Sequence, residues 1–231
     1  MAEVVLRADK PAHGGYCVGR LDGQVVFCRY CLPGETVTAR VTEDSGRFLR
    51  ADALAVRHDP HPQRRESPCP WFGPDRCGGC SWLHTTPEEQ LLLKSQILSE
   101  TLQRIGGVAE QVPVVSLGLE AGWRTRMTLH ADGEGRLGFH GARSDRIVAV
   151  GDCLQAAAEL ETAALLARQW PPGADVHVSV SDAGRAVIVR HADGSREADG
   201  PQEHVHDVHG RLFTCAVDGF WQSHRLAPEV L

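Results

Sequence analysis

The fold of the first part of this chain is decided by one stretch, Gln24-Val25-Val26-Phe27-Cys28-Arg29-Tyr30-Cys31-Leu32-Pro33-Gly34-Glu35-Thr36-Val37-Thr38-Ala39-Arg40-Val41. Two runs rich in β-branched and aromatic residues flank its Pro33-Gly34 turn, as in two strands joined by a loop. Shorter runs of the same kind lie at 4–6 and 47–53. Short strands separated by glycine-containing turns are typical of an OB-like β-barrel, which we predict here.

A long helix is predicted from Pro87 to Ile105. Thr86 suits the N-cap, Pro87 the first helical position, and Glu89 completes a capping box. The Gly106-Gly107 pair ends the helix. Its apolar residues fall on two sides, which indicates a helix that packs between two partners. One side carries Leu91, Leu98, Leu102 and Ile105, and the other carries Leu93 and Ile97.

Residues 111–217 are predicted to form an α+β domain. Residues 124–130 alternate polar and apolar side chains, as a half-buried strand does. The Asp132-Gly133 turn leads into a second strand at 136–140. A helix is predicted over 155–170. Further strands are predicted over 175–180, 185–190 and 211–216. The chain as a whole is therefore expected to be α+β, with the barrel first.

Four cysteines form the most specific chemical pattern in the chain. Cys69, Cys77 and Cys80 share one short loop with spacers of seven and two residues, and Cys153 follows after a further 72 residues. Soft thiolates in such a group suit an iron–sulfur cluster or a structural zinc ion. Gly78-Gly79 would let the backbone curl closely around a cluster and direct amide N–H groups at its sulfides.

Disulfides and a zinc ribbon are the alternative uses of these cysteines. The N-terminus has no apolar signal-peptide core, and no stretch reaches the ~18 apolar residues of a membrane helix. We therefore expect a cytoplasmic protein without membrane contact. In the reducing cytoplasm, clustered cysteines are more often metal ligands than disulfides. A zinc ribbon would use the C-x-x-C pairs at 28–31 and 77–80. It would leave Cys69 and Cys153 unused, so the iron–sulfur interpretation is favoured.

The charge balance argues against a bulk nucleic-acid binder. The chain carries 24 basic and 30 acidic residues, a net charge of −6. Any RNA contact therefore needs a local basic patch. Three histidines, His204, His206 and His209, have metal-like spacing. Their alternation with valines instead predicts solvated side chains on the exposed face of a strand.

These parts, in this order, resemble the bacterial RNA uracil-C5 methyltransferases that make 5-methyluridine in ribosomal RNA. That family has an N-terminal TRAM domain (an OB-like barrel), a central domain with a [4Fe-4S] cluster, and a C-terminal S-adenosylmethionine-dependent methyltransferase domain. Residues 22–41 look like the TRAM core. Trp123-Arg124-Thr125-Arg126 is similar to the family's aromatic-Arg-x-basic strand, and Leu137-Gly138-Phe139 to its Leu-Gly-Phe. Residues 219–224 are similar to its Phe-aromatic-Gln motif.

The resemblance implies a site residue in each part of the chain. The family's cluster ligands correspond to Cys69, Cys77, Cys80 and Cys153. The first spacer is seven residues where the family usually has five, and His224 stands where the Gln motif normally ends in Asn. Gln222 is similar to the residue that reaches the methyl donor. Arg124 and Arg126 share one face of their predicted strand, and we expect them to contact RNA.

The resemblance also implies four regions and an incomplete enzyme. They are 1–58 (TRAM barrel), 59–110 (linker, cysteine loop and helix), 111–217 (central domain) and 218–231 (start of a methyltransferase domain). Methylating C5 of uracil needs a thiolate to attack C6, a base to remove the C5 proton, and a donor pocket. The family keeps these groups on later segments, so methyl transfer by this chain alone is not expected.

We therefore expect the N-terminal and central portion of an RNA (uracil-C5) methyltransferase, which binds a structural [4Fe-4S] cluster and an rRNA or tRNA. S-adenosylmethionine would bind only in a full-length protein, where the missing methyltransferase domain is the intramolecular partner. One alternative is a stand-alone RNA-binding module with a structural iron–sulfur or zinc site. Another is a small iron–sulfur electron-transfer protein.

Overall fold

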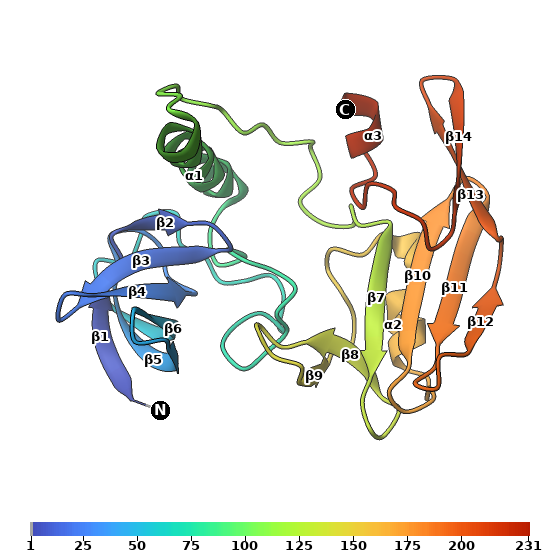
Figure 1. Ribbon diagram of the computed structural model, residues 1–231, viewed down its shortest axis with the longest axis horizontal. Coiled ribbons are helices and arrows are strands. Elements are labelled where there is room, and N and C mark those ends of the chain that lie inside the picture. Colours follow the sequence, from blue (N-terminus) through green and yellow to red (C-terminus); the bar gives the residue numbers. More distant parts are fainter. Residues whose placement is uncertain (1) are drawn as a thin grey trace. The chain divides into compact units, whose positions relative to one another are not determined.

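Figure 1 shows the computed structural model, which describes residues 2–231, so that only Met1 of the predicted barrel lies outside it. The chain divides into two compact units. The first contains the residues up to Arg76 together with Cys80–Ser116, and the second contains Cys77–Gly79 together with Leu117–Leu231. The residues of the cysteine loop are thus divided between the two units.

The first unit is built on a curled six-stranded sheet in the order β1-β5-β6-β4-β3-β2 (Figure 1). Its strands are β1 (Glu3–Arg7), β2 (Lys10–Ala12), β3 (Tyr16–Leu21), β4 (Gln24–Arg29), β5 (Thr36–Asp44) and β6 (Phe48–His58). β4 and β6 run parallel and the other neighbours antiparallel. Register shifts along β5 and β6 mark bulges, which bend strands. The sheet confirms the predicted OB-like barrel.

The ends of this sheet approach each other between β1 and β3. Asp9 N–H, just after β1, donates a hydrogen bond to Val18 O at 2.7 Å. A Cβ atom on Gly19 would lie 2.2 Å from the carbonyl oxygen of Arg7, so only glycine fits there. Inward-facing residues of alternate positions fill the interior: Leu6, Val26, Cys28, Val37, Ala39 and Ala51 are all buried.

A buried carboxylate holds the turn between β4 and β5. Glu35 is fully buried and accepts hydrogen bonds from the N–H groups of Leu32 at 2.8 Å and His61 at 3.0 Å. Arg64 binds both carboxylate oxygens, with Nη2 2.7 Å from Oε2 and Nε 2.5 Å from Oε1. Burial alone would raise the pKa of Glu35, but the hydrogen bonds from Arg64, His61 and Leu32 outweigh it and hold this pKa below its usual range.

The long helix of the first unit, α1 (Pro87–Gly106), has the predicted ends. Thr86 Oγ1 accepts from Glu89 N–H, and Gly107 closes the helix with φ 68°. Leu93 and Ile97 pack against Leu32 and Trp82. The other predicted apolar side is largely exposed, with Leu98 at 38% and Ile105 at 76%. One of the two predicted apolar sides is therefore packed within the unit.

The second unit contains an antiparallel sheet in the order β12-β11-β10-β7-β8-β9 and a separate β13-β14 hairpin. The strands are β7 (Arg126–Ala131), β8 (Leu137–His140), β9 (Ile147–Ala149), β10 (Asp175–Ser181), β11 (Gly184–Arg190), β12 (Arg196–Asp199), β13 (Glu203–Val208) and β14 (Arg211–Ala216). Two short helical turns, η1 (Ala158–Leu160) and α2 (Thr162–Leu166), contribute Leu160 and Leu165 to its core. The helix α3 (Ala227–Val230) lies near the C-terminus.

Two predictions for the second unit are wrong. The helix expected over 155–170 is reduced to η1 and α2, because Glu161 between them has φ 52° and interrupts the helical backbone. His204 lies on β13 as expected for a strand residue, but it is 1% exposed rather than solvated. Its two ring nitrogens lie 2.8 Å from Ser181 Oγ and 2.7 Å from Ser179 Oγ on β10.

Within residues 2–231 no helix is long and apolar enough to cross a membrane.

Candidate functional site

Three segments that are distant in the sequence lie side by side where β7 begins. On one side, Arg124 N–H donates to Gln155 O at 2.8 Å and Ala157 N–H donates to Arg124 O at 2.9 Å. On the other side, Thr125 N–H donates to Ser223 O at 2.8 Å. The Arg124 segment is therefore flanked by the segment that follows Cys153 and by the segment that contains Gln222.

Arg126 is buried and its guanidinium faces the protein. Nη2 donates to Val217 O at 3.0 Å and Nη1 donates to Trp221 O at 3.3 Å. Burial lowers the pKa of Arg126 from its ordinary value. Arg126 therefore does not lie on an exposed face with Arg124 as the strand pattern predicted. It connects β7 to the segment before Gln222.

Arg124 is half-buried and rests on an aromatic stack. Its guanidinium lies 5.2 Å from the centre of the Trp123 ring, and Trp123 stacks on His224 with ring centres 5.3 Å apart and an interplanar angle of 14°. Within residues 2–231 Arg124 forms no ion pair with a carboxylate. The arrangement presents a cation supported by a ring, which suits contact with a phosphate or a base. No local signal predicts the Trp123–His224 stack, because about a hundred residues separate its members.

Gln222 is half-buried, and tertiary contacts hold the residues before and after it in the chain. Trp221 stacks on His206 with ring centres 4.2 Å apart and an interplanar angle of 6°. The carbonyl of Ser223 is bonded to Thr125, as described above. The residues on both sides of Gln222 are thus held, Trp221 by the His206 ring on β13 and Ser223 by Thr125 just before β7. The position of this side chain is set by tertiary contacts rather than by its own loop.

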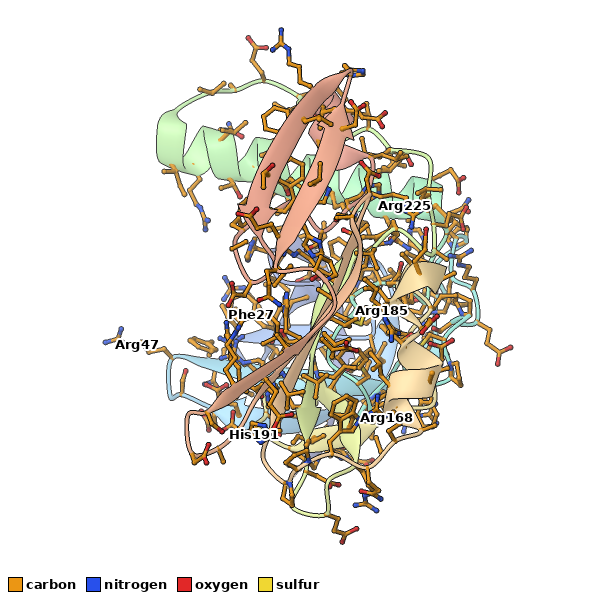
Figure 2. All side chains as sticks on the ribbon, turned by 90° about the vertical axis from the view of Figure 1, so that its right-hand side faces the viewer. Phe27, Arg47, Arg168, Arg185, His191 and Arg225 are labelled. Carbon is orange, nitrogen blue, oxygen red and sulfur yellow. The ribbon has the colours of Figure 1, made fainter. Side chains whose placement is uncertain are left out.

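A cavity of about 370 Å³ lies beside the same segment, and its lining includes Trp221 and His206. Two arginines on its wall, Arg185 and Arg225, are labelled in Figure 2. Both are already paired: Arg185 Nη1 lies 2.5 Å from Glu161 Oε2, and Arg225 Nη2 binds Glu159 at 2.9 Å. The wall also carries Asp182, Asp207 and Glu229. The mixture of charges selects no single class of ligand.

Two of the four predicted cluster ligands, Cys77 and Cys153, belong to the second unit, and both are half-buried. Cys77 forms a β-bridge with Gly141. A Cβ atom on Gly78 would lie 2.5 Å from Ala142 N, so this position accepts only glycine. Gly79 N–H donates to Cys77 Sγ at 3.4 Å. An amide N–H directed at a cysteine sulfur is the type of contact expected from the Gly-Gly pair.

The other two predicted ligands, Cys69 and Cys80, are half-buried in the first unit. The loop around Cys69 is folded on itself, because Cys69 N–H donates to Ser67 Oγ at 3.2 Å and Phe72 N–H donates to Cys69 O at 3.2 Å. Among residues 2–231, no group of three or more His, Cys, Asp or Glu side chains is arranged to hold a metal ion. The four-cysteine ligand set therefore stays a prediction.

The cysteines of the zinc-ribbon alternative lie inside the barrel. Cys28 and Cys31 are fully buried together with Cys17, which is opposite Cys28 in the β3–β4 pair. Hydrogen bonding to Cys31 and burial raise the pKa values of Cys17 and Cys28. Hydrogen bonds from Cys17 and Cys28 lower the pKa of Cys31 to about 5. These three sulfurs contact one another in the core and belong to its packing.

Known proteins resemble this chain in sequence and in fold. Residues 5–54 match the TRAM domain. An uncharacterized RNA methyltransferase from Streptomyces coelicolor is 38% identical over 95% of this chain and 57% of its own length. The 23S rRNA (uracil(1939)-C(5))-methyltransferase RlmD from Pseudomonas putida is 35% identical over 80% of this chain and 43% of its own length. The chain contains a TRAM domain and is similar to RNA methyltransferases over most of its own length.

One solved structure has a similar fold. The tRNA (uracil-54, C5)-methyltransferase of Pyrococcus abyssi, in complex with S-adenosyl-L-homocysteine, superposes with a TM-score of 0.63 over 95% of this chain and 62% of that chain. The two sequences are 16% identical, so the likeness concerns the fold. The chain spans somewhat more than half the length of the Streptomyces coelicolor relative. Both the family resemblance and the α+β class predicted from the sequence are confirmed.

Proposed function

We propose that this chain forms the RNA-binding and cluster-bearing portion of an RNA (uracil-C5) methyltransferase that acts on rRNA or tRNA in the cytoplasm. The observation that carries the proposal is the junction at β7. There the Arg124 segment lies between the segment after Cys153 and the segment of Gln222. Two motifs that resemble this family, at 123–126 and 219–224, are thus neighbours in one unit, next to the segment that follows the proposed ligand Cys153. Similarity to RNA methyltransferases over most of the chain supports the same conclusion.

The two arginines have different parts in this proposal. Arg124, supported by the Trp123 ring, contacts RNA through a phosphate or a base. Arg126 was predicted to do the same, but its guanidinium is bonded to the carbonyls of Val217 and Trp221. It acts by holding the segment before Gln222 in place. The RNA contact thus rests on Arg124 and the shape of the junction on Arg126.

The proposed cofactor is a structural [4Fe-4S] cluster on Cys69, Cys77, Cys80 and Cys153. Four thiols are the donor set that such a cluster takes. The Gly79 amide on Cys77 Sγ supports a backbone directed at sulfur, and the glycine at Gly78 lets this loop pass close to the backbone of Ala142. When bound, the cluster would stabilise the fold by fixing segments that are distant in the sequence. The half-buried positions of all four cysteines suit ligands shielded from bulk water.

The proposed donor contact is the amide of Gln222, and the chain alone is proposed to be inactive. A donor site encloses most of its ligand with many converging groups. Within residues 2–231 both large sheets are mainly antiparallel, and no Gly-rich loop joins a parallel strand to a helix as in nucleotide-like cofactor sites. The catalytic thiolate and base would come from a methyltransferase domain, which is the proposed intramolecular partner.

The decisive experiment deletes the gene that encodes this chain and measures 5-methyluridine in purified rRNA and tRNA by nucleoside mass spectrometry. We expect the modification to disappear from one RNA and to return on complementation with the wild-type gene. Complementation with Arg124→Ala should restore less of it. Unchanged 5-methyluridine in every RNA would overturn the methyltransferase proposal. RNA binding by the purified protein in that case would favour the stand-alone RNA-binding module.

A further inference from the structure

The outward face of the barrel sheet carries three aromatic rings around one arginine. Tyr16 on β3, Phe27 on β4, and Phe48 and Arg50 on β6 make up this aromatic face. Phe27 is paired with Arg50 in the β4–β6 register. The residues between them along the strands, Val26, Cys28, Leu49 and Ala51, are buried in the barrel core. Because side chains alternate along a strand, the aromatic face points away from the core.

The rings and the guanidinium form one contiguous cluster. Phe27 and Phe48 pack edge to face with ring centres 5.5 Å apart, and Tyr16 and Phe27 do so at 6.1 Å. The Arg50 guanidinium lies 5.0 Å from the centre of the Phe48 ring, 5.4 Å from Tyr16 and 5.9 Å from Phe27. Glu43 on β5 holds it from the side, 3.0 Å from Arg50 Nε. The cluster is therefore built before any ligand arrives.

This face retains surface that a ligand can reach. Phe27 and Phe48 are half-buried and the Arg50 side chain is 19% exposed, whereas Tyr16 is only 8% exposed. The part of the face that a ligand can reach is therefore Phe27, Phe48 and Arg50. The barrel core does not need these groups, because its apolar residues lie on the opposite side of the strands. The rings stand edge to face, with interplanar angles of 78° and 85°, so a further planar group would pack against a single ring or the planar guanidinium rather than against one continuous plane. Nucleobases are such groups, and every base has a π face.

A positive charge stands next to the rings. Arg47, in the turn between β5 and β6, directly precedes Phe48 and is exposed. Figure 2 shows its side chain extending away from the barrel. Arg47 has no hydrogen-bond or ion-pair partner within the described part of the chain. The neighbouring Asp44 carboxylate accepts from Gly46 N–H at 2.8 Å within its own turn. A phosphate next to a stacked base would therefore meet an available guanidinium.

We propose that the aromatic face binds unpaired bases of single-stranded RNA by stacking on Phe48, Arg50 and Phe27, while Arg47 neutralises an adjacent phosphate. This inference rests on the proposed function in taking RNA as the ligand, but it concerns a second site in the other unit. The combination of a π platform with a nearby cation is the chemistry by which barrels of this type hold single strands. Such binding tolerates many sequences, so this face supplies affinity rather than selection of one uridine.

The test titrates the 231-residue protein with a fluorescent single-stranded RNA of about ten nucleotides, within the site size of one barrel. A second titration uses an abasic strand of the same length. Phe48→Leu and Phe27→Leu keep apolar bulk but lose the ring, and each should weaken binding of the base-containing strand about tenfold. Arg50→Lys keeps the positive charge but lacks the planar guanidinium, and it should also weaken binding of the base-containing strand severalfold. None of the three should weaken binding of the abasic strand.

Two further variants complete the design. Arg47→Ala should lower the slope of log K against log salt by about 0.7, the value for one phosphate contact on a single strand. Phe213→Leu, at a 44% exposed phenylalanine in the second unit, is the matched control and should bind as wild type does. Thermal unfolding of each variant is also measured. If Arg50→Lys unfolds as the wild type does, its RNA affinity still tests the proposal even where a Phe→Leu variant loses stability.

The outcomes separate this inference from the proposed function. Wild-type affinity in the Phe48→Leu, Phe27→Leu and Arg50→Lys proteins would overturn the aromatic face, even if the gene deletion removes 5-methyluridine. If these variants lose as much affinity for the abasic strand as for the base-containing strand, the contact is with phosphate and the stacking proposal is also overturned. Absence of RNA binding by the wild-type protein would overturn it as well. The variants could also lose RNA binding while 5-methyluridine is unchanged in the deletion strain. That result would support the aromatic face and overturn the methyltransferase proposal.

Discussion

Arg126 Nη2 donates a hydrogen bond to the carbonyl oxygen of Val217 at 3.0 Å and so joins β7 to a segment 91 residues later. The same guanidinium donates to Trp221 O, next to Gln222. Val217 is itself 1% exposed and packs with Ala186 and Ile188. The position of the Gln222 segment therefore depends on a buried cation that the strand pattern assigned to the surface.

Arg126→Met should destabilise the second unit by about 1–3 kcal/mol. The carbonyl of Trp221 loses the Arg126 donor, and the buried carbonyl of Val217 loses its 3.0 Å bond and keeps the longer contact from Ser179 Oγ at 3.4 Å. Urea unfolding followed by tryptophan fluorescence measures this, since Trp221 lies in the affected segment. Arg124→Met is the matched control and should cost less than Arg126→Met, because the half-buried Arg124 side chain is held by the Trp123 ring rather than by carbonyl acceptors. Equal stability of the two variants would contradict the role assigned to Arg126.

Breaking the Glu35–Arg64 pair should cost far more than breaking a surface pair. Glu35→Ala leaves a cation facing a buried site and should cost about 3–5 kcal/mol. Asp59→Ala removes an exposed pair with Arg7, 3.7 Å apart, and should cost under about 1 kcal/mol. A double-mutant cycle with Arg64→Ala measures the coupling by chemical denaturation. Additive losses would show that the two groups do not stabilise each other.

The lowered pKa of Glu35 gives the first unit an acid dependence. The folded-state pKa lies below the value of about 4.3 in the unfolded chain. The stabilisation from ionised Glu35 is therefore complete above that value and is lost as the pH falls through the folded-state pKa. In Glu35→Gln the unfolding free energy should fall less steeply in this acid range. A wild-type slope in that variant would assign the acid loss to other groups.

The cluster prediction concerns metal content. Anaerobically purified protein should be brown with about four iron atoms per chain. Cys153→Ser should lose the iron, whereas Cys28→Ser, at a buried barrel residue, should keep it. Iron and zinc are measured by inductively coupled plasma mass spectrometry, with the visible absorption spectrum as a second readout. Stoichiometric zinc without iron would favour a zinc site instead.

His204 should make the second unit less stable as the pH falls. Burial, followed by the positive charges of Arg126 and nearby histidines, lowers its pKa to about 4. The unfolded value is about 6.5, so between these values the unfolded chain binds the extra proton. The unfolding free energy should therefore drop by up to about 1.4 kcal/mol per pH unit as the pH falls through this window. His204→Gln should flatten the slope, and exposed His209→Gln should not.

Methyl transfer and donor binding by the 231-residue protein should be absent. The amide of Gln222 is a single polar group, whereas a donor site needs many converging groups. Calorimetry with S-adenosylmethionine should show no heat of binding, and a tritiated donor should transfer no label to rRNA or tRNA. Tight donor binding by this protein would overturn the assignment of the donor site to a separate domain.

Local sequence signals were sufficient where a structure depends on neighbours in the chain. The ends of α1 follow from Thr86, Pro87 and Gly107, whose capping chemistry acts within a few residues. The same holds for the turn after β7, where the Asp132 carboxylate accepts from Glu134 and Arg136 N–H groups. The metal chemistry inferred from the cysteine spacing stays a prediction, because the spacing names the thiols and only the fold can bring them together.

Tertiary structure decided which side of each strand is buried. His204 and Arg126 both sit in patterns that predict exposure, yet Ser179, Ser181 and the carbonyls of Val217 and Trp221 satisfy them in the interior. A polar side chain is stable inside a protein only when such partners exist, and these partners come from distant segments. The aromatic face likewise exists only because the register places Arg50 beside Phe27. The sequence determined the capped helix α1 and most of the strands, because their signals are local, and the pairing of remote segments decided which residues are available to a ligand.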